Sequence, residues 1–167
     1  MPVGFLRVTD DPFADDRFTA MGLLMEVHAG ISAAYRPELE QLGLSGPAFE
    51  VLLRLARSPA HRLRMTELAG QSTLTNSGLT RLIDRLERAD LVRREPCPDD
   101  GRGFFAVLTD AGHERLLTAV PKHLATVDRI FTGVLEPDEL DAMLHALRKI
   151  RAVVKPDSDP QVTLSRR

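Results

Sequence analysis

The sequence has few of the residues on which several large classes of protein depend. Its 167 residues include one cysteine, one tyrosine and no tryptophan. A single cysteine, Cys97, cannot form an internal disulfide, which favours a reducing compartment. The shortage of large aromatic side chains argues against a site that stacks on single-stranded nucleic acid or sugars.

Long apolar segments are also missing. No uncharged run approaches the roughly 18 apolar residues that a membrane span requires. The N-terminus has neither the leading positive charge nor the apolar stretch of a signal peptide. We therefore expect a cytoplasmic protein with no membrane partner. Its formal net charge is −2, so any basic surface must be local.

The usual signatures of catalysis and metal binding do not occur. The five histidines form no HxxxH or HxH pair, which argues against a zinc site. There is no nucleophile elbow and no phosphate-binding glycine loop. The sequence therefore predicts neither an enzyme nor a bound cofactor.

Apolar residues recur at helical spacing in most of the chain. Residues 18–36 form one helical stripe, which we expect Pro37 to end. Ser45 is placed to cap a second helix, which ends at Ser58-Pro59. Thr66 and Thr75 are placed to cap two short helices, the second running to about Ala89. Thr109 is placed to cap a long helix that continues to Val134 with a kink at Pro121, and a last helix covers 137–154.

Three short segments have the character of strands. Residues 61–65 alternate apolar and polar side chains, and two further runs cover 91–95 and 104–108. Prolines, aspartates and glycines between the last two predict a hairpin with its loop over 96–103.

This order predicts a mainly α protein with a small β-wing, a winged helix-turn-helix flanked by N- and C-terminal helices. We divide it into a flexible arm (1–16), a first long helix (17–43), a central winged helix-turn-helix lobe (44–109), C-terminal helices (110–154) and a flexible tail (155–167).

The helix that follows Thr75 has the character of a DNA-binding element. Its first turn is short and polar, so its free amides and hydroxyls can approach phosphates. Arg81 is the favoured base-reading residue, since a planar guanidinium matches the two acceptors of guanine. Arg102, between two glycines at the hairpin tip, can enter a minor groove. The predicted DNA-binding residues are Thr75, Asn76, Ser77, Thr80, Arg81, Arg85, Arg102 and Gly103.

Charge alone leaves a different interpretation open. Residues 75–105 carry six arginines and six acids, so the segment is neutral. Arg81 and Arg85 alternate with Asp84 and Glu87, a pattern that also describes a solvated helix with its own ion pairs.

Several motifs together resemble the MarR (multiple antibiotic resistance regulator) family over residues 18–155. The matching segments are Leu44-Ser45-x-x-x-Phe49-x-x-Leu52, Glu67-Leu68-Ala69, Leu74 to Glu87, Leu91-Val92-Arg93-Arg94, Asp100-Gly101-Arg102-Gly103 and Val107 to Gly112. The resemblance implies a winged-helix homodimer, with 17–43 as its first dimerisation helix and 110–154 as its C-terminal dimerisation helices. Such a dimer binds a pseudo-palindromic operator in double-stranded DNA and is often released by a small aromatic or phenolic effector.

Three positions depart from the family pattern. Gly78 stands where Thr or Ala is common, at a cost of about 1 kcal/mol in helix propensity. Asp90 replaces the glycine that usually ends the reading helix, and we expect it to adopt the left-handed conformation. Ser72 replaces an apolar residue beneath that helix.

Two residues are candidates for effector binding. His28 falls on the apolar stripe of the first helix, beside the region where the family's ligand cleft lies, although a hydrogen-bonded interface histidine has the same pattern. Arg54, with Arg57, could hold a carboxylate, or could simply be solvated. Cys97, at the base of the wing, suggests a redox switch, which would require a resolving partner.

The sequence thus predicts a ligand-responsive repressor that binds its operator as a homodimer. The alternative is a winged-helix protein-interaction module that does not bind DNA, and the neutral charge of residues 75–105 is its best support.

Overall fold

The computed structural model describes residues 11–98 and 100–156 and confirms a mainly helical chain with one small sheet. The helices are α1 (Asp16–Gln41), α2 (Gly46–Ala56), α3 (Met65–Gln71), α4 (Asn76–Arg88), α5 (Asp110–Ile130) and α6 (Pro137–Val154). The strands are β1 (Arg62–Arg64), β2 (Val92–Cys97) and β3 (Asp100–Leu108), and short 3-10 turns cover Pro12–Ala14, Pro59–His61 and Thr132–Val134. Residues 1–10 and most of the predicted tail lie outside the described residues.

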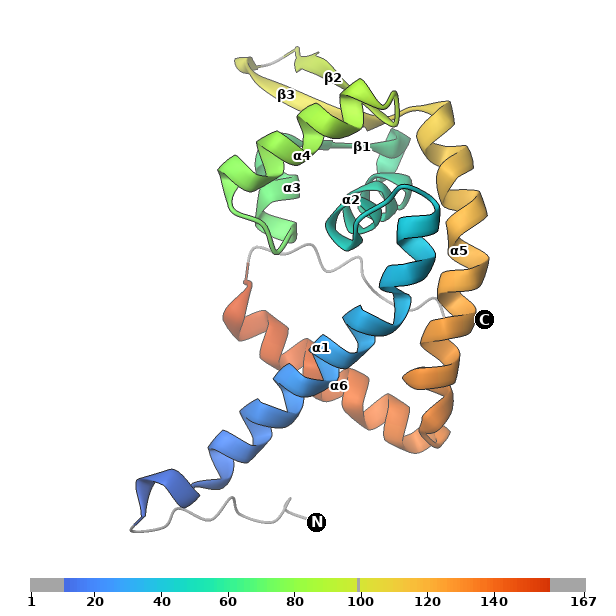
Figure 1. The fold of residues 1–167 in the computed structure, drawn as a ribbon. Coiled ribbons are helices and arrows are strands. Elements are labelled where there is room, and N and C mark those ends of the chain that lie inside the picture. Colours follow the sequence, from blue (N-terminus) through green and yellow to red (C-terminus); the bar gives the residue numbers. More distant parts are fainter. Residues whose placement is uncertain (1–10, 99, 157–167) are drawn as a thin grey trace.

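Figure 1 shows a central lobe, made of α2, α3, α4 and the sheet, together with three long helices, α1, α5 and α6. The sheet is antiparallel, with the strand order β1-β3-β2. The helices α1 and α6 cross below the lobe, and α5 runs along its side.

The core lies in the central lobe. The predicted inward stripe of α4, at Leu79, Leu82, Ile83 and Leu86, is buried. It packs in one cluster with buried leucines from α2 and α3, including the fully buried Leu52 and Leu68. Burial of one such side chain stabilises a fold by about 1.5–3 kcal/mol. The core therefore fixes which face of α4 points outward.

Three of the four predicted helix caps are confirmed. The side chains of Ser45, Thr75 and Thr109 accept hydrogen bonds from the amides of Ala48, Gly78 and Gly112 at 3.3, 3.2 and 3.0 Å. The cap at Thr66 is wrong, since α3 already begins at Met65. There the Glu67 carboxylate accepts the amide of Arg64 at 2.9 Å, so an acid inside the first turn satisfies the helix start.

Prolines interrupt the helices less than expected. The prediction that Pro37 ends the first helix is wrong, because α1 continues through it to Gln41. Proline removes one backbone donor, but the last turn is held by Leu39, which is 2% exposed in the core. Gly43, with φ of 67°, follows this turn. The long helix α5 contains Pro121 and ends at Ile130, earlier than predicted.

The predicted wing loop over 96–103 is also wrong in its extent. Strand β2 continues to Cys97 and β3 begins at Asp100, so only residues 98 and 99 separate them. Pro96 pairs with Phe104, and the register shifts between Pro96 and Cys97. Proline is tolerated there because β2 is an edge strand, where an absent donor breaks no ladder on the open side.

Candidate nucleic-acid interface

Helix α4 lies on the outside of the central lobe, beside the sheet (Figure 1). Six of the residues predicted for DNA binding belong to it or to its cap, and all six are exposed: Thr75, Asn76, Ser77, Thr80, Arg81 and Arg85. The buried leucine stripe occupies the opposite face. The helix therefore presents a polar and cationic surface to solvent, as the sequence predicts.

The first turn of α4 combines fixed hydroxyls with free amides. The Thr75 hydroxyl accepts the amide of Gly78 and lies 3.3 Å from the Ser77 hydroxyl. The Thr80 hydroxyl donates to the Asn76 carbonyl at 3.0 Å. A helix leaves the amides of its first residues without an intrahelical acceptor, here those of Asn76 and Ser77. These donors and the positive end of the helix dipole together suit a phosphate oxygen.

The acids of α4 are bound by an arginine from the wing. Arg94 of β2 donates to Asp84 and to Glu87, at 2.5 Å in each case, and its own amide donates to Glu87 at 3.1 Å. Partial burial opposes the charge of Arg94, but the hydrogen bonds with both carboxylates outweigh it and raise its pKa. Arg94 thus holds both carboxylates on the side of the helix that faces the sheet, and its single positive charge offsets one of their two negative charges.

This pairing leaves the other arginines of α4 uncompensated. Within residues 11–98 and 100–156, neither Arg81 nor Arg85 forms an ion pair. The alternative in which they pair with Asp84 and Glu87 is wrong. Arg88 is held along the helix by a 3.1 Å hydrogen bond from its Nε to the Asp84 carbonyl. A shallow groove at this face is lined by Pro47, Leu74, Gly78, Arg81, Leu82, Asp84, Arg85 and Arg88.

The wing supplies the remaining predicted contacts. Residues 100–103 begin strand β3 next to the hairpin turn. Gly103 lies in this strand, whereas the side chain of Arg102 lies outside the described part of the structure. Its minor-groove role therefore stays a prediction. At the other end of the hairpin, Asp90 has φ of 56°, so the left-handed turn expected after α4 is confirmed.

The two predicted effector residues lie on different helices. His28 is exposed on α1. Arg54 on α2 binds Glu50 through its Nε at 3.2 Å and a terminal nitrogen at 2.6 Å, so a ligand carboxylate would compete with that glutamate. Their role in effector binding remains a prediction.

Sequence reasoning missed a polar cluster where α1, α2 and α5 meet. The His123 ring lies between Tyr35 and Phe49, with ring centroids 5.0 and 4.5 Å away. Burial lowers the pKa of His123, opposed by the charge of Glu38. Among the described residues, His123 Nδ1 and Glu38 Oε2 have no hydrogen-bond partner. No spacing in the sequence could reveal this group, because it draws on three helices.

The remaining sites that the sequence raised are less favoured. Cys97 is 3% exposed, and a buried thiol is a poor redox sensor. Within the described part of the chain, no three potential metal ligands come together. No helix in that part is long and apolar enough to cross a bilayer.

Comparison with known proteins adds independent information about this interface. A model of the MarR family matches residues 44–104. An uncharacterised helix-turn-helix transcriptional regulator of Bacillus subtilis, YkoM, is 35% identical over 108 residues, which are 64% of this chain and 68% of that protein. AbsC, a MarR family transcriptional regulator from Streptomyces coelicolor, is 34% identical with a TM-score of 0.79 over 90% of this chain and 98% of its own.

A second structure from Streptomyces coelicolor was solved in complex with DNA. This MarR family regulator, Sco3205, is 30% identical, with a TM-score of 0.79 over 94% of this chain and 97% of its own.

Proposed function

The chain belongs to the MarR family of transcriptional regulators, and from this we propose that it binds an operator in double-stranded DNA as a homodimeric, ligand-responsive repressor. In this proposal α4 enters the major groove, and Arg81 and Arg85 read or contact it. The wing, with Arg102, contacts the adjacent minor groove. A relative of similar length has been solved with DNA, which supports the proposal.

The observation that carries this proposal is the pairing of Arg94 with Asp84 and Glu87. The neutral composition of residues 75–105 left open that Asp84 and Glu87 pair with Arg81 and Arg85, which would cancel the positive charge that attracts phosphates. Because both acids are bound by the wing, the exposed face keeps the charge of Arg81 and Arg85. A net positive face is what a duplex requires at close range.

The homodimer is supported by the apolar surface of the long helices. On α1, the exposed fractions are 65% for Phe18, 55% for Met21 and 57% for Met25. On α6, Ile150, Val153 and Val154 are 52–81% exposed. A single protomer rarely leaves so much apolar surface in water. A two-fold dimer through these helices would set the two α4 helices about one turn of DNA apart.

Release by a small aromatic or phenolic effector, typical of the family, completes the proposal. The effector would act by binding more tightly to one separation of the two α4 helices than to another. His28 and Arg54 are our candidates for its recognition, and the His123 cluster lies where α1, α2 and α5 meet.

One experiment separates this function from a module that binds only protein. Genomic fragments from the source organism are selected on the purified protein. The affinity for the best fragment is then measured by fluorescence anisotropy between 50 and 200 mM salt. If roughly six phosphates are contacted, the affinity should fall about 10³-fold or more over this range. Affinity that does not change with salt, or no selected fragment at all, would contradict DNA binding. Aromatic acids and phenols are then screened for release of that fragment.

A further inference from the structure

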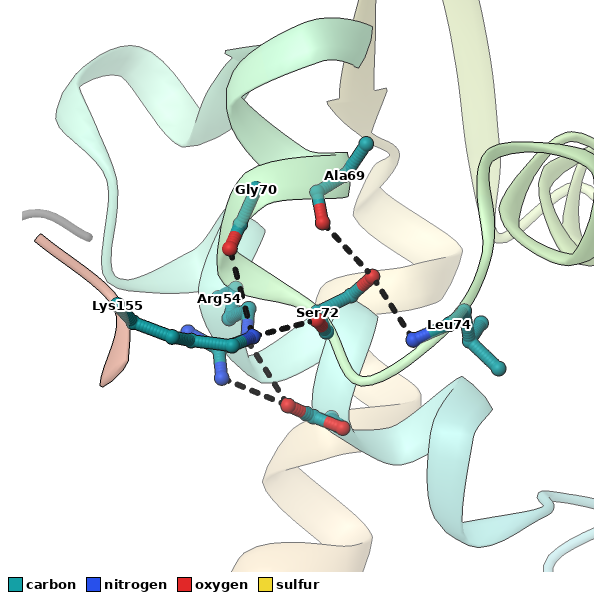
Figure 2. A network of polar contacts seen from close by, with 7 residues as sticks. Arg54, Ala69, Gly70, Ser72, Leu74 and Lys155 are labelled. Atoms are coloured by element: carbon teal, nitrogen blue, oxygen red, sulfur yellow. Dashed lines mark hydrogen bonds and ion pairs between the residues drawn. The ribbon is translucent and has the colours of Figure 1, made fainter. Parts of the chain in front are cut away.

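The end of α6 reaches the turn between α3 and α4. Figure 1 shows the C-terminus of α6 directly below this turn. Lys155, the residue that ends α6, extends its side chain to the backbone there (Figure 2). Its Nζ donates to the carbonyl of Ser72 at 2.8 Å and lies 3.4 Å from the carbonyl of Gly70. A helix proposed for dimerisation thus contacts the helix-turn-helix of its own chain.

The receiving carbonyls are those that a helix end leaves unsatisfied. Ser72 is the C-cap of α3, and the carbonyls of a last helical turn have no intrahelical donor. They also form the negative end of the helix dipole, which favours a lysine ammonium. One charged donor therefore satisfies two acceptors at once.

Ser72 joins the end of α3 to the residues that precede α4. It is 5% exposed, and its hydroxyl donates to the Ala69 carbonyl at 3.4 Å and accepts the amide of Leu74 at 3.3 Å. Thr75, three residues further along the chain, caps α4. The serine that departs from the family pattern thus connects the Lys155 contact to the start of the DNA-binding helix (Figure 2).

We propose that Lys155 is a positioning residue for DNA binding, whose ammonium ties the α3–α4 turn to the end of α6 and so fixes the orientation of α4 relative to the dimerisation helices. The inference rests on the proposed function, since orientation matters only if two copies of α4 must match two half-sites. Loss of the contact would let the lobe rotate, and the dimer would then discriminate less between half-site spacings.

The test compares Lys155→Met, which keeps the aliphatic stem, with Lys155→Arg, which keeps the charge and donors. Lys149→Met is the matched control, because Lys149 is an exposed lysine on the same helix. Affinities are measured for the best selected operator and for versions with one base pair added or removed between half-sites. Thermal unfolding and dimer mass are recorded for every variant.

We expect the wild type to lose at least about tenfold in affinity when the spacing changes, a difference of about 1.4 kcal/mol. Lys155→Met should lose less than about threefold, Lys155→Arg should restore most of the discrimination, and Lys149→Met should equal the wild type. A uniform loss of affinity at all spacings, or an unchanged preference in Lys155→Met, would overturn the inference.

Hydrogen exchange of the amides at residues 72–76 provides a readout that needs no DNA. Exchange there should be at least about fivefold faster in Lys155→Met than in the wild type or in Lys149→Met, and near normal in Lys155→Arg. If exchange in Lys155→Met equals that of the wild type, the proposed role of the Lys155 contact with the α3–α4 turn is refuted, even if the protein binds no operator. If the wild type binds no DNA but exchange in Lys155→Met is faster, the proposed function fails and the contact itself stands.

Discussion

At the scale of single residues, two carboxylates decide how much positive charge α4 presents. Asp84 and Glu87 look like partners for their neighbours when only spacing along the helix is considered. The structure places Arg94 against both of them, a contact across a helix and a strand that sequence spacing cannot reveal. Arg81 and Arg85 therefore present their positive charge on the solvent-facing side of α4.

Replacement of Arg81 by alanine should therefore weaken operator binding by about 1–3 kcal/mol and relax specificity at one base pair, because a guanidinium that reads guanine is lost. The measurement is anisotropy on the selected operator and on all single-base variants of one half-site. Arg57→Ala, which removes an exposed arginine that ends α2, is the control and should bind as the wild type does. An unchanged base preference in Arg81→Ala would remove Arg81 from the interface.

Several features that depend only on residues close together in the chain were predicted correctly from the sequence. The caps at Ser45, Thr75 and Thr109 follow from a hydroxyl that reaches an amide three residues on. The left-handed Asp90 follows from a turn that a short polar side chain tolerates. The His123 cluster and the Lys155 contact could not be predicted, because each joins residues far apart in the chain.

At the scale of elements, α5 is seated on the wing through a glycine. A Cβ atom on Gly112 would lie 2.2 Å from the Leu91 carbonyl oxygen and 2.7 Å from Leu108 Cδ1. The carbonyl belongs to the backbone just before β2, and it also accepts the amide of Thr109 at 3.2 Å. The first turn of α5 therefore packs against the residue that precedes β2 and the residue that ends β3. This close contact sets the angle between the central lobe and α5.

Gly112→Ala should destabilise the fold by about 1–3 kcal/mol, because the backbone must move to admit one methyl group. Urea unfolding followed by circular dichroism measures this change. Gly70→Ala is the matched control, since nothing lies within 4 Å of a Cβ there; it should hold stability or raise it by up to about 1 kcal/mol. Equal stability of the two variants would contradict the close approach.

Element boundaries were harder to predict where proline intervened. The cost of Pro37 and Pro96 is local and modest, and the surroundings decide whether an element survives it. Burial of Leu39 sustains the end of α1, and an open edge accommodates Pro96 in β2. The type and order of the elements came from periodicity, which such single positions do not change.

At the scale of the whole molecule, the exposed apolar side chains of the long helices are the surface on which the proposed dimer depends. Met25 is 57% exposed in the protomer, in a row of apolar side chains along α1. Met25→Glu should therefore shift the dimer toward monomer, because a charge would be buried against apolar surface. Sedimentation or light scattering across protein concentrations measures the shift. Glu26→Gln, a neighbouring exposed change, is the control; an unaltered mass for Met25→Glu would place the dimer interface elsewhere.

The clamp of Arg94 on α4 has a consequence for how this protein and its binding sites can change together. Because one side chain from β2 holds two successive turns of α4, we expect the helix and the hairpin to approach a duplex as one rigid unit. A base change that shifts the position of either element must then shift both. The affinity for variant operators would therefore depend on the helix and the hairpin together, rather than on separate contacts in the major and minor grooves. Substitution at Arg94 would uncouple them and, in the same step, remove the one positive charge that offsets Asp84 and Glu87 on the helix that we propose enters the major groove.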